Sequence, residues 1–179
     1  VQRALMDENV QYLAIAIYWC YIKPISITLI PYVTFSLFHL LTFTRTTILP
    51  AFIPASRAPD GTTQVAGGNA SKLIQTWVKD NYDRAMRFVS YAEVAIFARV
   101  FIGALLLRNS LIAPLLYAHF LRLRFYMSSF TRAAFQHVRS ELDGLTQNPS
   151  CPPVVRKGYL TLTDLVSRYA STVLSINQD

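Results

Sequence analysis

The chain has 179 residues, of which 53% are hydrophobic and 15% are charged, and its formal net charge is +7. Soluble domains are charged at roughly a quarter of their positions, so this composition excludes an ordinary water-soluble domain and predicts a membrane protein. A basic balance also suits nucleic acid, but the sequence has no dense Lys/Arg cluster and no RNA-binding signature, so we expect no nucleic-acid partner.

The first apolar stretch runs from Val10 to Phe43, and Lys23 is its only formal charge. As one straight helix it would be about 50 Å long, well beyond a hydrocarbon core of about 30 Å. Proline lacks the donor that a helix interior needs and moves the preceding residue out of the α region. Lys23 and Pro24 therefore predict a tight turn, and the stretch is predicted to be a hairpin. Its arms are Asn9–Ile22, which is short, and Ile25–Phe43, which is longer.

The longer arm is expected to kink at Pro31 and to end at Thr44-Arg45, where the arginine can reach the headgroups. Residues 49–71 are rich in proline and glycine and are expected to form a flexible linker. Basic residues outnumber acidic ones in residues 44–87 and again in residues 122–179. The positive-inside rule places both stretches in the cytosol.

Residues Lys72–Arg87 have the pattern of an amphipathic helix at the membrane surface. The apolar side of this helix includes Ile74, Trp77, Val78 and Tyr82. The pattern leads directly into a third apolar arm, Phe88–Leu107. A polar turn at Arg108 and Asn109 connects this arm to a short fourth arm, Leu111–Leu121, which Arg122 and Arg124 are expected to end.

A second amphipathic pattern runs from Pro152 to Ile176. Apolar side chains recur there every three or four residues, at Val155, Tyr159, Leu162, Val166, Tyr169 and Val173. A helix of this kind can lie in the plane of the membrane surface, and packing against a neighbouring helix is an equal alternative.

Two charges lie inside the third arm, at Glu93 and Arg99. Six helical residues correspond to about 240° of rotation, so the two side chains do not share a face. Intramembrane charges mark contacts or pathways. We expect a structural ion pair or contacts with another chain, and a proton or substrate path is the alternative.

The sequence carries no motif for catalysis or for a cofactor. It has no glycine-rich phosphate loop, no nucleophile motif and no paired-carboxylate site, and its three histidines do not have metal-ligand spacing. We therefore expect no enzyme activity, no cofactor and no metal.

Five short stretches, in order along nearly the whole chain, are characteristic in their residues. They are Phe35–His39 with the following residues to Arg45, Ala92-Glu93-Val94, His119–Arg124, Cys151–Arg156 and Val166-Ser-Arg168. Together they resemble the eukaryotic transmembrane protein 33 family, whose fungal members include nuclear pore membrane proteins.

The resemblance implies a multi-pass, non-catalytic protein of the endoplasmic reticulum and nuclear envelope. It implies a role in shaping or stabilising curved membrane and in organising nuclear pore complexes. The implied partners are the lipid bilayer and reticulon-like or other nuclear pore membrane proteins. The alternative function is an accessory or regulatory subunit of a larger membrane complex.

The expected fold is an all-α integral membrane protein with two helical hairpins, about four membrane-embedded helices, and cytosolic amphipathic helices. The expected divisions are residues 1–48 (first hairpin), 49–71 (cytosolic linker), 72–127 (interfacial helix and second hairpin) and 128–179 (cytosolic amphipathic region).

Overall fold

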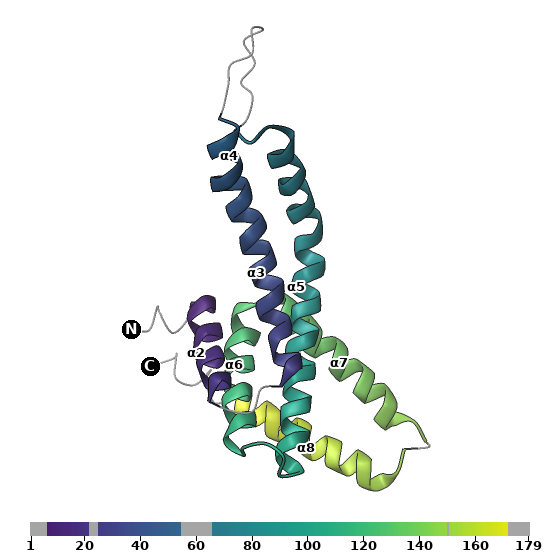
Figure 1. Ribbon diagram of the computed structural model, residues 1–179. Helices are drawn as coiled ribbons and strands as arrows, with labels where there is room; N and C mark the ends of the chain where they lie inside the picture. The colour runs from purple at the N-terminus through teal and green to yellow at the C-terminus, as the bar shows by residue number, and fades with distance from the viewer. Residues whose placement is uncertain (1–6, 22–24, 55–65, 150, 172–179) are drawn as a thin grey trace, which may run out of the picture. The chain divides into compact units, whose positions relative to one another are not determined.

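The computed structural model describes residues 7–21, 25–54, 66–149 and 151–171. Every regular element in this part of the chain is a helix (Figure 1), which confirms the predicted all-α class. The chain forms two compact units, Val1–Tyr117 and Ala118–Asp179.

The first unit contains the long apolar helices. Its elements are α2 (Glu8–Cys20), the 3₁₀ turn η1 (Ser26–Leu29), α3 (Ile30–Phe43), the π-helical turn η2 (Thr44–Ile48), α4 (Leu49–Phe52), α5 (Gly68–Leu105) and the start of α6 (Ile112–Met127). Helix α2 begins where the Asp7 carboxylate accepts the backbone N–H groups of Asn9 at 2.8 Å and Val10 at 3.4 Å, since these donors have no partner inside the helix.

The predicted end of the second arm at Thr44-Arg45 is wrong, because the helical path continues through η2 and α4 to Phe52. The polar residues there do not stop the helix, since a threonine hydroxyl can bond back into it. The Thr46 hydroxyl donates to the Thr42 carbonyl at 2.9 Å. Pro31 lies in the first turn of α3, directly after the 3₁₀ turn η1, where its missing N–H leaves no α-helical bond unmade.

Helix α5 is one continuous helix of 38 residues, about 57 Å long, so the amphipathic stretch and the third arm are joined directly as predicted. It starts beside α4 because Gly67 adopts a left-handed φ of 83°. A Cβ on Gly67 would lie 2.7 Å from the Ser71 Cβ and 3.0 Å from the Leu49 Cβ. The Gly67 N–H donates to the Ile53 carbonyl at 2.8 Å. Residues 49–71 are thus helical at both ends.

Helices α3 and α5 pack side by side and antiparallel (Figure 1). The Phe38 ring lies between the rings of Trp77 and Tyr82, with both centroid distances at 6.0 Å. This register sets the apolar second half of α3 beside the charged first half of α5. The first hairpin and the third arm therefore share one packed unit.

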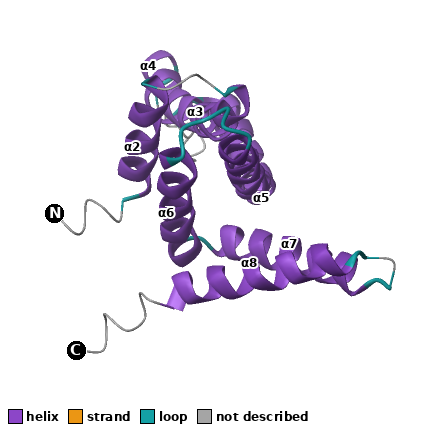
Figure 2. Ribbon diagram, turned by 90° about the horizontal axis from the view of Figure 1, so that it is seen from below, coloured by secondary structure: helices purple, strands orange, loops and turns teal. Residues whose placement is uncertain are grey.

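The second unit contains the end of α6, helix α7 (Ser129–Gln147) and helix α8 (Pro153–Ser171), and α7 and α8 lie side by side in both ribbon views (Figures 1 and 2). The predicted end of the fourth arm at Arg122 and Arg124 is wrong, since α6 continues to Met127. Sequence analysis did not identify α7, which begins where the Ser128 hydroxyl accepts the Thr131 N–H at 3.2 Å.

Two helical stretches among the described residues are long and apolar enough to cross a membrane, Ser26–Phe52 and Gly68–Leu105. Helix α2 has 13 residues and α6 has 16, and both are shorter than the roughly 20 that a perpendicular crossing needs. The two short arms therefore remain predicted membrane-embedded helices rather than observed spans.

Helix α5 ends in a Schellman motif. The Arg108 N–H donates to the Gly103 carbonyl at 2.8 Å, and the Leu107 N–H donates to the Ala104 carbonyl at 3.0 Å. The motif requires a left-handed residue, and Leu107 supplies it with a φ of 53°. A leucine with a left-handed φ has a steric clash between its Cβ and the backbone, which a glycine avoids.

We expect Leu107→Gly to stabilise the purified protein by about 1 kcal/mol, because it removes the left-handed strain at a side chain that makes little contact. Thermal unfolding in detergent measures the change. Leu106→Gly is the matched control, since Leu106 has an ordinary φ of −85° and glycine there only loosens the chain. A lower melting temperature for Leu107→Gly would contradict this account of the motif.

Candidate functional site

The deepest polar group of the first unit is the Glu93 carboxyl on α5, whose side chain is fully buried. The Tyr12 hydroxyl on α2 donates a hydrogen bond to Glu93 Oε1. Tyr12 itself is 8% exposed. A carboxyl group removed from water needs such donors, because leaving it unbonded costs more than the bond contributes. This pair therefore ties α2 to α5.

The Tyr12 ring is also held by α3. It meets the Phe35 ring at 4.9 Å and the Tyr32 ring at 5.8 Å, both edge to face. The Tyr32 hydroxyl donates to the Tyr12 backbone carbonyl at 3.0 Å. One tyrosine of α2 thus contacts both α3 and α5.

We expect Tyr12→Phe to destabilise the protein by about 1–3 kcal/mol, because Glu93 Oε1 loses a buried donor while the ring packing is kept. Thermal unfolding of the detergent-purified chain measures the loss. Tyr21→Phe is the control, since Tyr21 is 86% exposed and its hydroxyl has no buried partner to lose. Equal melting temperatures for Tyr12→Phe and wild type would refute the importance of this bond.

Arg99, the other charge of the third arm, is exposed on a different face of α5 from Glu93. Its guanidinium extends toward the end of the helix, where Nη1 lies 3.2 Å from the position that a Cβ on Gly103 would take. That same Cβ would collide with the side-chain amide of Asn109. Gly103 thus leaves room for the turn to fold back, with Asn109 half-buried and Arg108 exposed. The predicted turn residues Lys23 and Pro24 lie outside the described residues.

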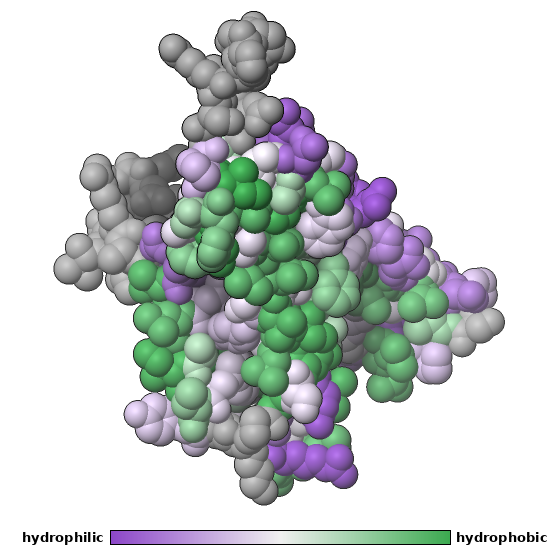
Figure 3. Space-filling model, turned by 45° about the horizontal axis from the view of Figure 1, so that its top comes forward, coloured by the Kyte–Doolittle hydropathy of each residue, from purple (hydrophilic) through white to green (hydrophobic). Residues whose placement is uncertain are grey.

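The amphipathic first half of α5 faces α3 with Ile74 and Val78, which are half-buried. Trp77 and Tyr82 flank this contact and remain 44% and 46% exposed. Figure 3 shows hydrophobic residues gathered along the middle of the outer surface and hydrophilic residues beside them. The large exposed apolar side chains of α3 and α4 are Val33, Leu37, Leu40, Phe43 and Phe52.

Helix α8 carries the predicted membrane-surface residues on one face. Val155, Leu162 and Val166 are 55%, 50% and 56% exposed. Tyr159 is half-buried against α7, where its hydroxyl donates to Asp143 Oδ1 at 2.6 Å. The side chain of Tyr169 and all of Val173 lie outside the described residues.

Sequence analysis missed two members of the α8 face, Val154 and Leu165, which are 82% and 58% exposed. Their separation of eleven residues is three helical turns, so they form a row next to the predicted one. The helical spacing of Val154 and Leu165 could have identified both residues from the sequence. The apolar face is therefore broader than the single stripe that we predicted.

The hydrogen bond to Asp143 raises the pKa of the Tyr159 phenol above its ordinary value of 10.0, with burial as a smaller cause. Because the pKa is raised in the folded state, the contact stabilises the α7–α8 pair below about pH 10 and loses this effect as the pH rises past the raised pKa. We expect the melting temperature of Tyr159→Phe to lie slightly below wild type at neutral pH, with the difference disappearing at strongly alkaline pH. A difference that persists there would contradict this assignment.

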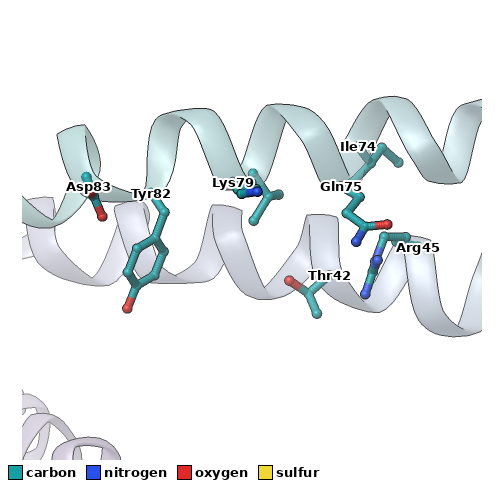
Figure 4. A pocket seen from close by; sticks show the side chains of 8 residues that line it. Thr42, Arg45, Ile74, Gln75, Lys79, Tyr82 and Asp83 are labelled. Carbon is teal, nitrogen blue, oxygen red and sulfur yellow. The ribbon is translucent and has the colours of Figure 1, made fainter.

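A groove of about 520 Å³ lies between α3 and α5 where η2 interrupts the α-helical path (Figure 4). It is lined by Thr42 and Arg45 from one side and by Ile74, Gln75, Val78, Lys79, Tyr82 and Asp83 from the other. Figure 4 shows Gln75 directed toward Arg45, while Asp83 lies at the opposite end of the row. Sequence analysis did not identify this groove, because it depends on the register of two helices.

Comparison with known proteins settles the family. A family model described as Transmembrane protein 33/Nucleoporin POM33 matches residues 1–172. The chain belongs to this family. The match confirms the resemblance drawn from the sequence strings and identifies a membrane protein.

Three curated relatives illustrate the range of organisms and of sequence identities within the Transmembrane protein 33/Nucleoporin POM33 family. Tetra-spanning protein 1 of Schizosaccharomyces pombe is 31% identical over 98% of this chain and 62% of its own length. Nucleoporin POM33 of Chaetomium thermophilum is 32% identical over 86% of this chain and 56% of its own length. Transmembrane protein 33 of Homo sapiens is 23% identical over 96% of this chain and 65% of its own length. No solved structure gives a significant match.

The chain thus spans about three fifths of the length of the curated relatives it matches. Among the described residues there is no group of three or more His, Cys, Asp or Glu side chains arranged to hold a metal ion.

Proposed function

We propose that this chain is a non-enzymatic protein of the endoplasmic reticulum and nuclear envelope that shapes or stabilises curved membrane and helps organise nuclear pore complexes. Family membership supports the location, since relatives carry the names Nucleoporin POM33 and Pore membrane protein of 33 kDa. Reticulon-like and other nuclear pore membrane proteins are its proposed partners.

The observation that carries the proposal is the exposed apolar face of α8. The side chains of Val154, Leu162 and Leu165 are each at least half exposed to their surroundings. Lys157 and Arg168 border this face beside Val154 and Leu165, and Arg156 lies on the opposite side of the helix. Such a helix lies in the interface plane, adds area to one leaflet and thereby favours its curvature, and its basic side suits the anionic lipids of the cytosolic leaflet.

The α3–α5 pair supports the same function. A charged side chain in the centre of a bilayer costs about 2.5–3.5 kcal/mol or more, so the first half of α5, with Lys72, Asp80 and Arg84, belongs outside the hydrocarbon. The second half of α3 lies at the same level, because the two helices pack in antiparallel register. Its exposed Leu40 and Phe43 then belong at the boundary between lipid and water. This two-helix projection would act as a wedge in one leaflet.

We also propose that the linker and the C-terminal region face the cytosol, and that the turns at Lys23-Pro24 and Arg108-Asn109 face the lumen. The excess of basic residues in residues 44–87 and 122–179 supports this orientation. The exposed Arg108 and the half-buried Asn109 are compatible with a turn among headgroups.

The curvature proposal is tested with fluorescently labelled full chain in giant vesicles from which narrow membrane tubes are pulled. We expect the wild type to be enriched on tubes relative to the flat membrane. The double variant Leu162→Glu/Val166→Glu should lose much of this enrichment, because two apolar contacts of about 1 kcal/mol each are replaced by charges that avoid lipid.

The matched control is Leu160→Glu/Ser167→Glu, which adds the same charge to exposed residues on the side of α8 away from Val154 and Leu165. It should keep most of the enrichment. A wild-type protein that is equally dense on tubes and on flat membrane would overturn the curvature proposal.

The second candidate function is an accessory subunit of a larger membrane complex. The exposed position of Arg99 on α5 favours it, since an arginine in an apolar helix calls for a partner or a polar route to the surface. We keep the proposed partner contact for Arg99 rather than for the buried Glu93. The tube assay separates the two candidates, because an accessory subunit has no reason to prefer curved membrane.

A further inference from the structure

We propose that the groove between α3 and α5 binds the phosphate-bearing headgroup of an anionic membrane lipid. The inference is independent of curvature, because it concerns one lipid molecule in one site. It rests on the charge, shape and position of the groove.

The groove offers two cations for an anion. Arg45 is half-buried on η2 and Lys79 is exposed on α5. Neither makes an ion pair with any residue in the part of the chain that the structure describes. Arginine matches the geometry of a phosphate with paired donors, and lysine adds a point charge.

Neutral polar groups complete the lining. The Thr42 hydroxyl and the Gln75 amide can both donate to phosphate oxygens, and Figure 4 shows Gln75 and Arg45 directed to the same part of the groove. Asp83 opposes an anion, but it lies at the end remote from Arg45 (Figure 4). The phosphate therefore belongs at the Arg45 end.

A local change in the backbone presents Arg45 to this groove. Residues Thr44–Ile48 form a π-helical turn between α3 and α4. Such turns are rare and are frequently found at functional sites. The turn inserts extra backbone at the point where the groove opens.

The surroundings favour a lipid over a free phosphate. Ile74 and Val78 provide apolar walls within the groove. Tyr82 also lines the groove and is 46% exposed, so its ring adds a surface that acyl chains can contact. A headgroup phosphate needs a charged pocket next to an apolar surface, whereas a soluble phosphate needs only the former.

The test uses the full chain in flat nanodiscs of phosphatidylcholine with and without phosphatidic acid, read by native mass spectrometry of retained lipid. We expect preferential retention of phosphatidic acid by the wild type. Arg45→Gln/Lys79→Gln should reduce this preference by about tenfold or more, since two charged hydrogen-bond donors are removed.

The matched control is Lys72→Gln/Arg87→Gln, which removes the same charge from exposed residues of α5 outside the groove. It should keep the preference. Equal loss in both double variants would show general electrostatic attraction and would overturn the site. Thr42→Val, which changes no charge and keeps the side-chain shape, should weaken retention by a smaller factor, and unchanged retention would count against the hydroxyl's role.

A final experiment distinguishes a lipid phosphate from a soluble phosphate as the occupant of the groove. Inorganic phosphate and glycerol 3-phosphate, added in excess, should leave the bound phosphatidic acid in place. Displacement by either would show that a soluble anion occupies the groove and would overturn the lipid assignment. Because the nanodiscs are flat, failure here leaves the curvature proposal unaffected, and failure of the tube assay leaves this site unaffected.

Discussion

The first unit depends on the hydrogen bond that one buried carboxyl group accepts at its Oε1 atom. Glu93 lies fully inside the protein, and its partner Tyr12 comes from the far end of the sequence. The phenol must point at the carboxyl, so the ring is fixed, and Tyr32 and Phe35 pack against its edges. Three helices thereby acquire a defined mutual position in an environment where apolar packing alone gives little preference between neighbours and lipid.

This fixed position has a consequence for the whole α3–α5 pair. Once the helices are held in register, the apolar end of α3 cannot be placed deep in lipid without taking the charged start of α5 with it. The pair must divide between two environments along its length. The part of the pair that carries the end of α5 is suited to hydrocarbon. The part that carries Arg45 and Lys79, together with the exposed Leu40 and Phe43, is suited to the boundary between lipid and water.

Local patterns were enough to predict most of the helices and several of their faces, although not α7. The apolar periodicity in α8 and the continuity of α5 were visible in the sequence because each depends on residues within a few turns. The extension of α3 beyond Thr44 was not, since polar residues usually end an apolar helix and here bond back into it. The N-cap at Ser128 was a usable signal for α7 that the polar character of the region obscured.

The contacts between distant parts of the chain could not be predicted in the same way. Tyr12 and Glu93 are 81 positions apart, and the residues around either one do not indicate that the two side chains are in contact. The groove at Arg45 likewise requires the register of two helices and a π-helical turn. The sequence shows where the charged residues lie along the chain, but only the packing of the helices shows which of them line the same groove.

The backbone hydrogen bond between Ile53 and Gly67 joins the two ends of the linker. The positions of α3 and α5 therefore do not depend on how many residues the linker contains. The tight glycine turn beside Leu49 closes the junction. The chain between Ile53 and Gly67 therefore leaves and returns at one point, and the entropy of closing a loop rises only slowly with its length. Added residues there need not disturb α3 or α5. This makes the junction a practical place for an epitope or fluorescent tag.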